Sequence, residues 1–71
     1  MSKVFEVRVK GALSDNERDA FKQISDFTIT EAPRETIICG AIVDESQLQG
    51  LLAIVRSLSL HLVQVRELPM S

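Results

Sequence analysis

The stretch from Thr36 to Val43, TIICGAIV, most restricts how this chain folds. It is apolar at both odd and even positions, whereas a strand with one face in water alternates apolar and polar residues. A strand that is apolar on both sides belongs at the centre of a sheet, with both faces at least partly covered. Gly40 inside this stretch indicates a bulge or a neighbour packed closely against it.

Three other stretches show the alternation of half-buried strands. In each, apolar side chains fall on one face and polar ones on the other. The apolar sets are Phe5, Val7 and Val9 in residues 4–10, Phe27 and Ile29 in residues 26–30, and Val63 and Val65 in residues 61–68.

A first helix is predicted after Ser14. Ser14 and Glu17 have the Ser-x-x-Glu spacing of a capping box, in which each side chain bonds the backbone N–H of the other residue. Ala20, Phe21 and Ile24 follow at helical spacing, which predicts a helix of about ten residues.

A second helix is predicted after Asp44. Asp44 and Gln47 resemble a second capping box, with Ser46 and Gln49 as the alternative start. Gly50 within this helix indicates close contact between the helix and the sheet. The apolar residues recur at helical spacing at Leu48, Leu51, Leu52, Val55 and Leu58.

The resulting order is strand, helix, strand, strand, helix, strand, with Gly11 ending the first strand and Pro33 in a turn over residues 31–35. Short connections and right-handed crossovers favour an α+β, ferredoxin-like βαββαβ sandwich. Its four-stranded antiparallel sheet has the order 4-1-3-2, with both helices on one face. At 71 residues, the chain is expected to be a single domain over residues 1–71.

Composition disfavours several classes of function. Eight Lys and Arg against ten Asp and Glu give a net charge of −2, so we expect neither a nucleic-acid binder nor a binder of anionic membranes. The apolar-rich stretch 48–62 is interrupted by polar residues and is too short to span a bilayer. With no apolar signal-peptide core in its first residues, the chain is expected to be cytoplasmic.

One cysteine and one histidine leave little basis for catalysis, a metal site or any other cofactor. Cys39 is expected to be a small buried residue of its apolar strand, and His61 an exposed turn residue. A thiolate nucleophile or a histidine base is the alternative for each. Residues 10–13 lack the paired cysteines of a copper chaperone and the arginine of an acylphosphatase loop. We therefore expect no enzyme.

Two short helices can cover only one side of a four-stranded sheet. The other side should carry polar residues around one parity of the third strand, whose candidates are Ile37, Ile38, Cys39, Ala41 and Ile42. Such a face is an interface or ligand platform, or else a solvated face with cross-strand pairs such as Glu6 with Arg66. Lys10 belongs to it as well. The candidate site residues are Glu6, Arg8, Thr28, Thr30, Cys39, Gln64 and Arg66.

Residues 48–66 and the first strand with its glycine, FEVRVKG at residues 5–11, resemble a group of short, mostly actinobacterial proteins of unassigned function. That group often has His before the helix glycine and Gly after the helix, where this chain has Gln49 and Ser59. The shared motifs are packing signatures and imply no chemistry. By fold alone the chain is also similar to ACT-like regulatory domains, which bind small effectors at subunit interfaces.

The leading hypothesis is a non-enzymatic, cytoplasmic interaction or accessory domain that forms a homodimer through the open sheet face or an edge strand. A small domain without disulfides or metals commonly gains stability from a partner chain. The alternative is a regulatory domain in which Arg8 and Arg66 receive a small anionic ligand. An enzyme using Cys39 or His61 ranks third, and an unidentified protein partner, as in an antitoxin-like role, also stays open.

Overall fold

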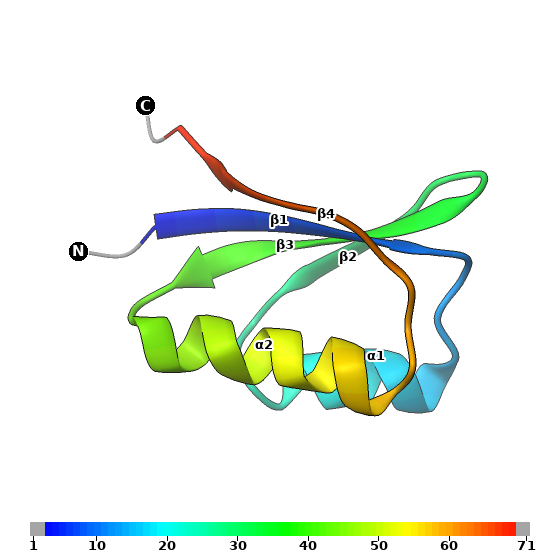
Figure 1. Ribbon diagram of the computed structural model, residues 1–71, viewed down its shortest axis with the longest axis horizontal. Helices are drawn as coiled ribbons and strands as arrows, with labels where there is room; N and C mark the ends of the chain where they lie inside the picture. The colour runs from blue at the N-terminus through cyan, green and yellow to red at the C-terminus, as the bar shows by residue number, and fades with distance from the viewer. Residues whose placement is uncertain (1–2, 70–71) are drawn as a thin grey trace.

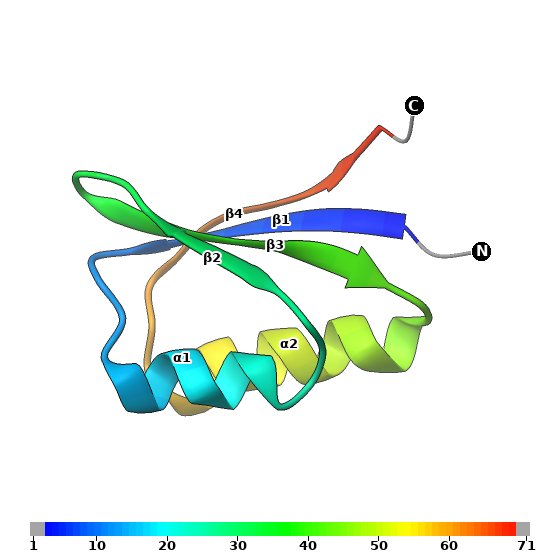
Figure 2. The ribbon, with the colours of Figure 1, turned by 180° about the vertical axis from the view of Figure 1, so that it is seen from behind.

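The computed structural model describes residues 3–69, which form a four-stranded antiparallel sheet and two helices. The strand order β2-β3-β1-β4 is the order 4-1-3-2 read from the other edge, so the predicted ferredoxin-like fold is confirmed. Both helices lie on the same side of the sheet (Figures 1 and 2). The elements are β1 (Lys3–Lys10), α1 (Asp15–Lys22), β2 (Thr28–Glu31), β3 (Glu35–Ile42), α2 (Glu45–Ser57) and β4 (Leu62–Leu68).

The core lies between the helices and one face of the sheet. Val7 and Val9 of β1 are fully buried there, as their alternation with Glu6 and Arg8 predicts. Phe21 is the buried residue of α1. The buried apolar side chains are Val7, Val9, Leu13, Phe21, Phe27, Ile38, Ile42, Leu51 and Val55.

The orientation of β3, which its sequence leaves open, follows from its pairing with β1. Glu6 lies opposite Cys39 and Arg8 lies opposite Ile37. Residues directly opposite each other in an antiparallel pair point to the same side. Ile37 and Cys39 therefore point away from the helices, and Ile38 points into the core. The prediction that Cys39 is a buried residue is wrong, because Cys39 is only partly buried and lies on the open side.

β2 begins at Thr28, two residues later than the alternation predicts. Phe27 turns into the core, where its side chain is 4% exposed, and the close neighbour predicted for Gly40 is this ring.

Both helices begin where their capping residues predict. In α1, Ser14 Oγ accepts from the N–H of Glu17 at 3.2 Å and Glu17 Oε1 accepts from the N–H of Ser14 at 2.8 Å, so the capping box is complete. The helix has eight residues rather than about ten. In α2, Asp44 is the cap and the alternative start at Ser46 is wrong.

The buried face of α2 differs in detail from the predicted one. Leu51 and Val55 are buried as expected, but Leu52 is only partly buried, and Ile54 packs against the core cluster. The predicted approach of Gly50 to the sheet is not found, since a Cβ built at Gly50 would have no sheet atom within 4 Å. A Cβ at Gly50 would lie 3.7 Å from Ile24 Cδ1, so Gly50 faces the segment that follows α1.

A bulge in β4 overturns the prediction that Val63 points inward. Arg8 pairs with Gln64 whereas Val9 pairs with Leu62, so Val63 is the extra residue of the irregular pair. Val63 is 50% exposed, while Val65 packs against the core as predicted.

Three segments distant in the sequence meet at Gly11, directly after the end of β1. The N–H of Gly11 donates to the carbonyl of Arg34 at 2.9 Å, and the buried Thr36 hydroxyl donates to the carbonyl of Gly11 at 2.7 Å. The N–H of Lys10 donates to the carbonyl of His61 at 2.8 Å. Gly11 has φ +84°, a conformation that favours glycine. In residues 3–69 neither helix is long and apolar enough to cross a membrane.

Candidate functional site

The candidate site is the side of the sheet opposite the helices, called the open face below. Within residues 3–69 no helix lies on that side (Figures 1 and 2). The strand registers place these residues on it: Val4, Glu6, Arg8 and Lys10 of β1, Thr28 and Thr30 of β2, Glu35, Ile37, Cys39 and Ala41 of β3, and Gln64, Arg66 and Leu68 of β4.

The structure brings the seven candidate residues together. They lie in two adjacent rows of paired residues, and each row has one residue from each of the four strands. The eighth position of the two rows is Ile37. From β2 to β4, the first row is Thr28, Cys39, Glu6 and Arg66, and the second is Thr30, Ile37, Arg8 and Gln64.

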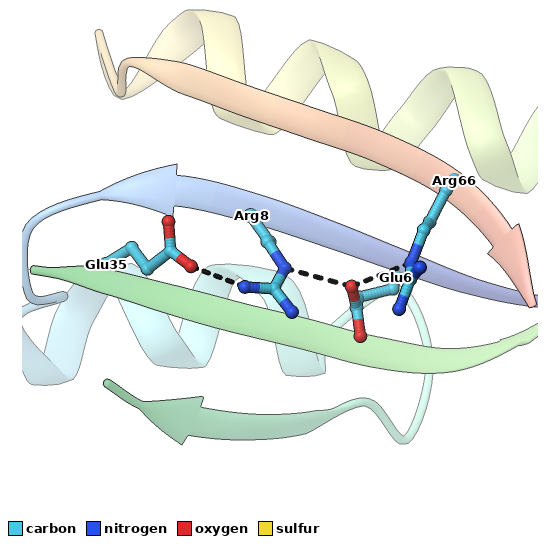
Figure 3. A network of polar contacts seen from close by, with 4 residues as sticks. All are labelled: Glu6, Arg8, Glu35 and Arg66. Carbon is cyan, nitrogen blue, oxygen red and sulfur yellow. Dashed lines mark hydrogen bonds and ion pairs between the residues drawn. The ribbon is translucent and has the colours of Figure 1, made fainter. Parts of the chain in front are cut away.

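A chain of ion pairs runs across three of the strands (Figure 3). Glu6 Oε1 accepts from Arg8 Nε at 3.0 Å and from Arg66 Nε at 3.1 Å. Arg8 Nη1 also donates to Glu35 Oε1 at 2.5 Å. The pair between Glu6 and Arg66 is the one that the alternation predicts. Glu35 was not predicted as a site residue, because the sequence pattern assigns it to the turn and not to the first position of β3.

These ion pairs perturb the groups at the centre of the chain. Hydrogen bonds from Arg8 and Arg66 lower the pKa of Glu6 from its ordinary value, although burial opposes this shift. The carboxylates of Glu6 and Glu35 raise the pKa of Arg8. The Glu6 side chain is 12% exposed even though it lies on the open face. The charges at the centre of the face are therefore held in a partly shielded, mutually neutralising arrangement.

The two ends of the open face differ in polarity. At one end, Val4 lies between Ala41 and Leu68. At the other end, Lys10 lies opposite Glu35 on β3 and is bonded through its N–H to the carbonyl of His61 just before β4. Polarity thus changes along the strands, from apolar to charged.

Cys39 and His61 are not brought together. Cys39 lies opposite Glu6, whereas His61 is bonded to Lys10, four residues farther along β1. His61 is exposed, as predicted for a turn residue. In the part of the chain that the structure describes, no three His, Cys, Asp or Glu side chains are grouped so that they could hold a metal ion.

A cavity of about 330 Å³ lies on the helix side, where β1 begins and α2 begins. Its apolar side chains read in the sequence as ordinary core residues, so no sequence signal identified it. Its lining is Lys3, Phe5, Ile42, Val43, Asp44, Glu45 and Leu48.

The topology and the uncovered sheet define a small, ferredoxin-like α+β domain with one open face. The chain belongs to the family described as a domain of unknown function, DUF8691, which matches residues 4–66. This match includes the two rows of candidate residues. No curated protein matches the chain.

Proposed function

We propose that this protein is a non-enzymatic interaction domain that pairs with a second copy of itself through the open face. The observation that carries the proposal is the composition of that face. Ile37, Cys39 and Ala41 form an apolar strip on its central strand β3, and the charges beside this strip already neutralise one another.

The pre-formed ion pairs favour burial of the face. An interface that buries a single unpaired charge is strongly destabilised, whereas paired charges cost much less to bury. Glu6 is bonded to two arginines, and Arg8 to two carboxylates. A partner can therefore cover the centre of the face without leaving these groups unpaired.

The edges of the sheet suit pairing less well than the face does. β4 carries the bulge at Val63 and the charged residues Arg66 and Glu67. β2 has four residues and is followed by Pro33. Bulges, charges, short strands and prolines are the features with which proteins prevent edge-to-edge pairing. This comparison favours the face over an edge strand.

The alternative, a small anionic ligand held by Arg8 and Arg66, is less well supported. An anion at Arg8 must compete with Glu6 and Glu35 for the guanidinium. Arg66 is more accessible, with a side chain that is 52% exposed, and bonds Glu6 through Nε. A thermal-shift screen with carboxylates, nucleotides and amino acids tests this alternative, because a ligand that binds the folded state raises its melting temperature.

Two further expectations belong to the proposal and rest on the sequence. We propose a cytoplasmic location, and we propose that the family's members are bacterial and mostly actinobacterial. The separation of Cys39 from His61 supports a role without catalysis.

Light scattering over a dilution series measures the native mass and tests the proposal directly. A dimer that persists at low micromolar concentration is expected. A monomer with a freely accessible open face would overturn the proposal and would direct the search to an unidentified protein partner.

Cys39 can report on the interface, since it lies partly buried at the centre of the open face. Its rate of reaction with a maleimide should fall as protein concentration rises and dimers form. The matched control carries Cys39→Ser with Ala53→Cys on the exposed side of α2, and its labelling rate should not depend on concentration. Equal behaviour of the two thiols would exclude the open face as the interface.

A charge on the face provides the complementary test. Ala41 is exposed and lies at the apolar end of the face, so Ala41→Glu should leave the fold intact and shift the protein toward the monomer. Ala53→Glu adds the same charge on α2 and should leave the dimer unchanged.

A further inference from the structure

We infer that the two copies meet about a two-fold axis that runs parallel to the strands, between β1 and β3, so that Lys10 of each copy faces Glu35 of the partner subunit. This inference rests on the proposed homodimer and specifies the orientation of the partner. It follows from the size of the open face and from the way polarity changes along it.

The open face is small, so a stable dimer needs all of it. The molecule measures 31 × 21 × 17 Å, and Figure 1, viewed along the shortest axis, looks across the strands. The face is thus 31 by 17 Å, or about 500 Å² in projection, whereas each partner in a standard interface buries roughly 800 Å² of accessible surface. Both the apolar and the charged ends must therefore lie within the contact.

Two sheets packed face to face keep their strands roughly aligned. A two-fold axis in the plane of such an interface runs either along the strands or across them. The first choice places each end of the face against the same end of the partner. The second places the apolar end of one copy against the charged end of the other.

An axis along the strands, between β1 and β3, exchanges these two strands row by row. Val4 then faces Ala41 of the partner subunit, which puts apolar against apolar. Lys10 faces Glu35 of the partner subunit, which puts opposite charges together. In the rows between them, the exchange of β2 with β4 brings Thr28 to Arg66 of the partner subunit, where hydroxyl and guanidinium can bond. Glu6 faces the partner's Cys39 and Arg8 faces the partner's Ile37, and both charged groups keep the ion pairs of their own copy.

An axis across the strands gives a poor match at the charged end. Lys10 then faces Val4 of the partner subunit, and Glu35 faces Ala41 of the partner subunit. Glu35 keeps its bond to Arg8 of its own copy. The Lys10 ammonium has no ion pair within residues 3–69, so it loses water and gains no polar group, which is unfavourable. The Lys10 charge at that end therefore selects the axis that is parallel to the strands.

Mixing two charge-reversal variants tests the inferred axis. In dimers of Lys10→Glu, glutamate faces Glu35, and in dimers of Glu35→Lys, lysine faces Lys10, so both repel. A mixed dimer restores attraction at both contacts. With one variant labelled with nitrogen-15, native mass spectrometry should show the ratio of mixed to unmixed dimers raised roughly ten-fold or more over random pairing.

The control pair is Asp19→Lys with Lys22→Glu, which changes the net charge equally but on α1, away from the open face. Random pairing is expected for this mixture. Random pairing of both mixtures would overturn the inferred axis, and so would an equal preference for mixed dimers in the two. A wild-type protein that is monomeric would instead overturn the proposed homodimer, so the two failures are distinguishable.

A cross-linking experiment covers the case in which Glu35→Lys, which loses its bond to Arg8, fails to fold. Val4→Cys and Ala41→Cys, which leave the ion pairs intact, are each made with Cys39→Ser, mixed, and treated with a short bis-maleimide. Mixed cross-linked dimers should form faster than in a mixture of Val4→Cys with Lys10→Cys, likewise made with Cys39→Ser. The opposite order would assign the axis across the strands.

Discussion

The ring of Phe27 lies directly against the backbone of Gly40. A Cβ on Gly40 would collide with Phe27 Cδ1, and it would lie 3.3 Å from Phe27 Cα, which is tighter than most real Cβ contacts. Because Phe27 is buried in the core and its own backbone is one of the close neighbours, the ring cannot simply swing away. This contact holds the chain before β2 against β3.

Gly40→Ala should therefore destabilise the fold. Overpacking of a well-packed core costs about 1–3 kcal/mol, and the new methyl group would meet both the ring and the backbone of Phe27. Urea unfolding followed by circular dichroism measures the loss. An unchanged unfolding midpoint would show that the segment before β2 moves aside freely.

The opposite result is expected at the helical glycine. A Cβ at Gly50 would make an ordinary contact with Ile24 Cδ1 at 3.7 Å. Gly50→Ala should stabilise the protein by about 0.5–1 kcal/mol, because alanine loses less backbone freedom in a helix. The two alanine variants are compared in the same unfolding experiment and should shift the midpoint in opposite directions.

Ser59 carries the helix-ending conformation that usually belongs to glycine. Its φ is +56°, its N–H donates to the carbonyl of Arg56 at 3.0 Å, and the N–H of Leu60 donates to the carbonyl of Val55 at 3.0 Å. Ser59→Gly should raise stability by about 0.5–1 kcal/mol. Ser57→Gly, within the last turn of α2, is the control and should lower it. Thermal melting distinguishes these outcomes.

The ion pairs of Glu6 predict a specific dependence on pH. Because the folded-state pKa of Glu6 lies below the ordinary value of 4.5, its pairs stabilise the fold above that pH, and the contribution disappears as pH falls through the folded-state pKa. Glu6→Gln should thus be less stable than wild type at neutral pH, with a difference that shrinks in acid. Unfolding at several pH values measures it.

Glu67→Gln serves as the control for that experiment. Glu67 pairs with Lys3 at 3.8 Å, and both side chains are at least half exposed, so the loss of this pair should change stability little. A Glu6→Gln variant whose deficit stays constant into acid would show that the deficit does not come from the ion pairs.

Because of the bulge in β4, we expect substitutions of Val63 and Val65 to affect stability differently, although the sequence alternation places both on the same face. Val63→Ala should change the free energy of unfolding by less than about 0.5 kcal/mol, as for other surface positions. Val65→Ala should cost about 1 kcal/mol or more, since Val65 packs against the core. Equal costs would mean that Val63 packs inward in solution.

Local patterns in the sequence determined most of the fold. The alternation in β1, the capping residues Ser14 and Asp44 and the apolar strand β3 each depend on neighbours within a few residues, so they identify the elements and their order. The sheet order then follows from general rules of connection. The presence of an open polar face, and the residues Glu6, Arg8 and Arg66 on it, came from the same alternation.

Only the tertiary structure decided the features that depend on strand register and on contacts between residues distant in the sequence. An apolar strand has no alternation to orient it, so the side of β3 that carries Cys39 was fixed only by pairing with β1. The bulge that exposes Val63 arises where β1 and β4 fall out of register, which no local pattern encodes. The ion pair of Arg8 with Glu35, which lies twenty-seven positions away in the sequence, likewise depends on the pairing of β1 with β3. The sequence determines which residues each element presents, and the fold determines which of them meet.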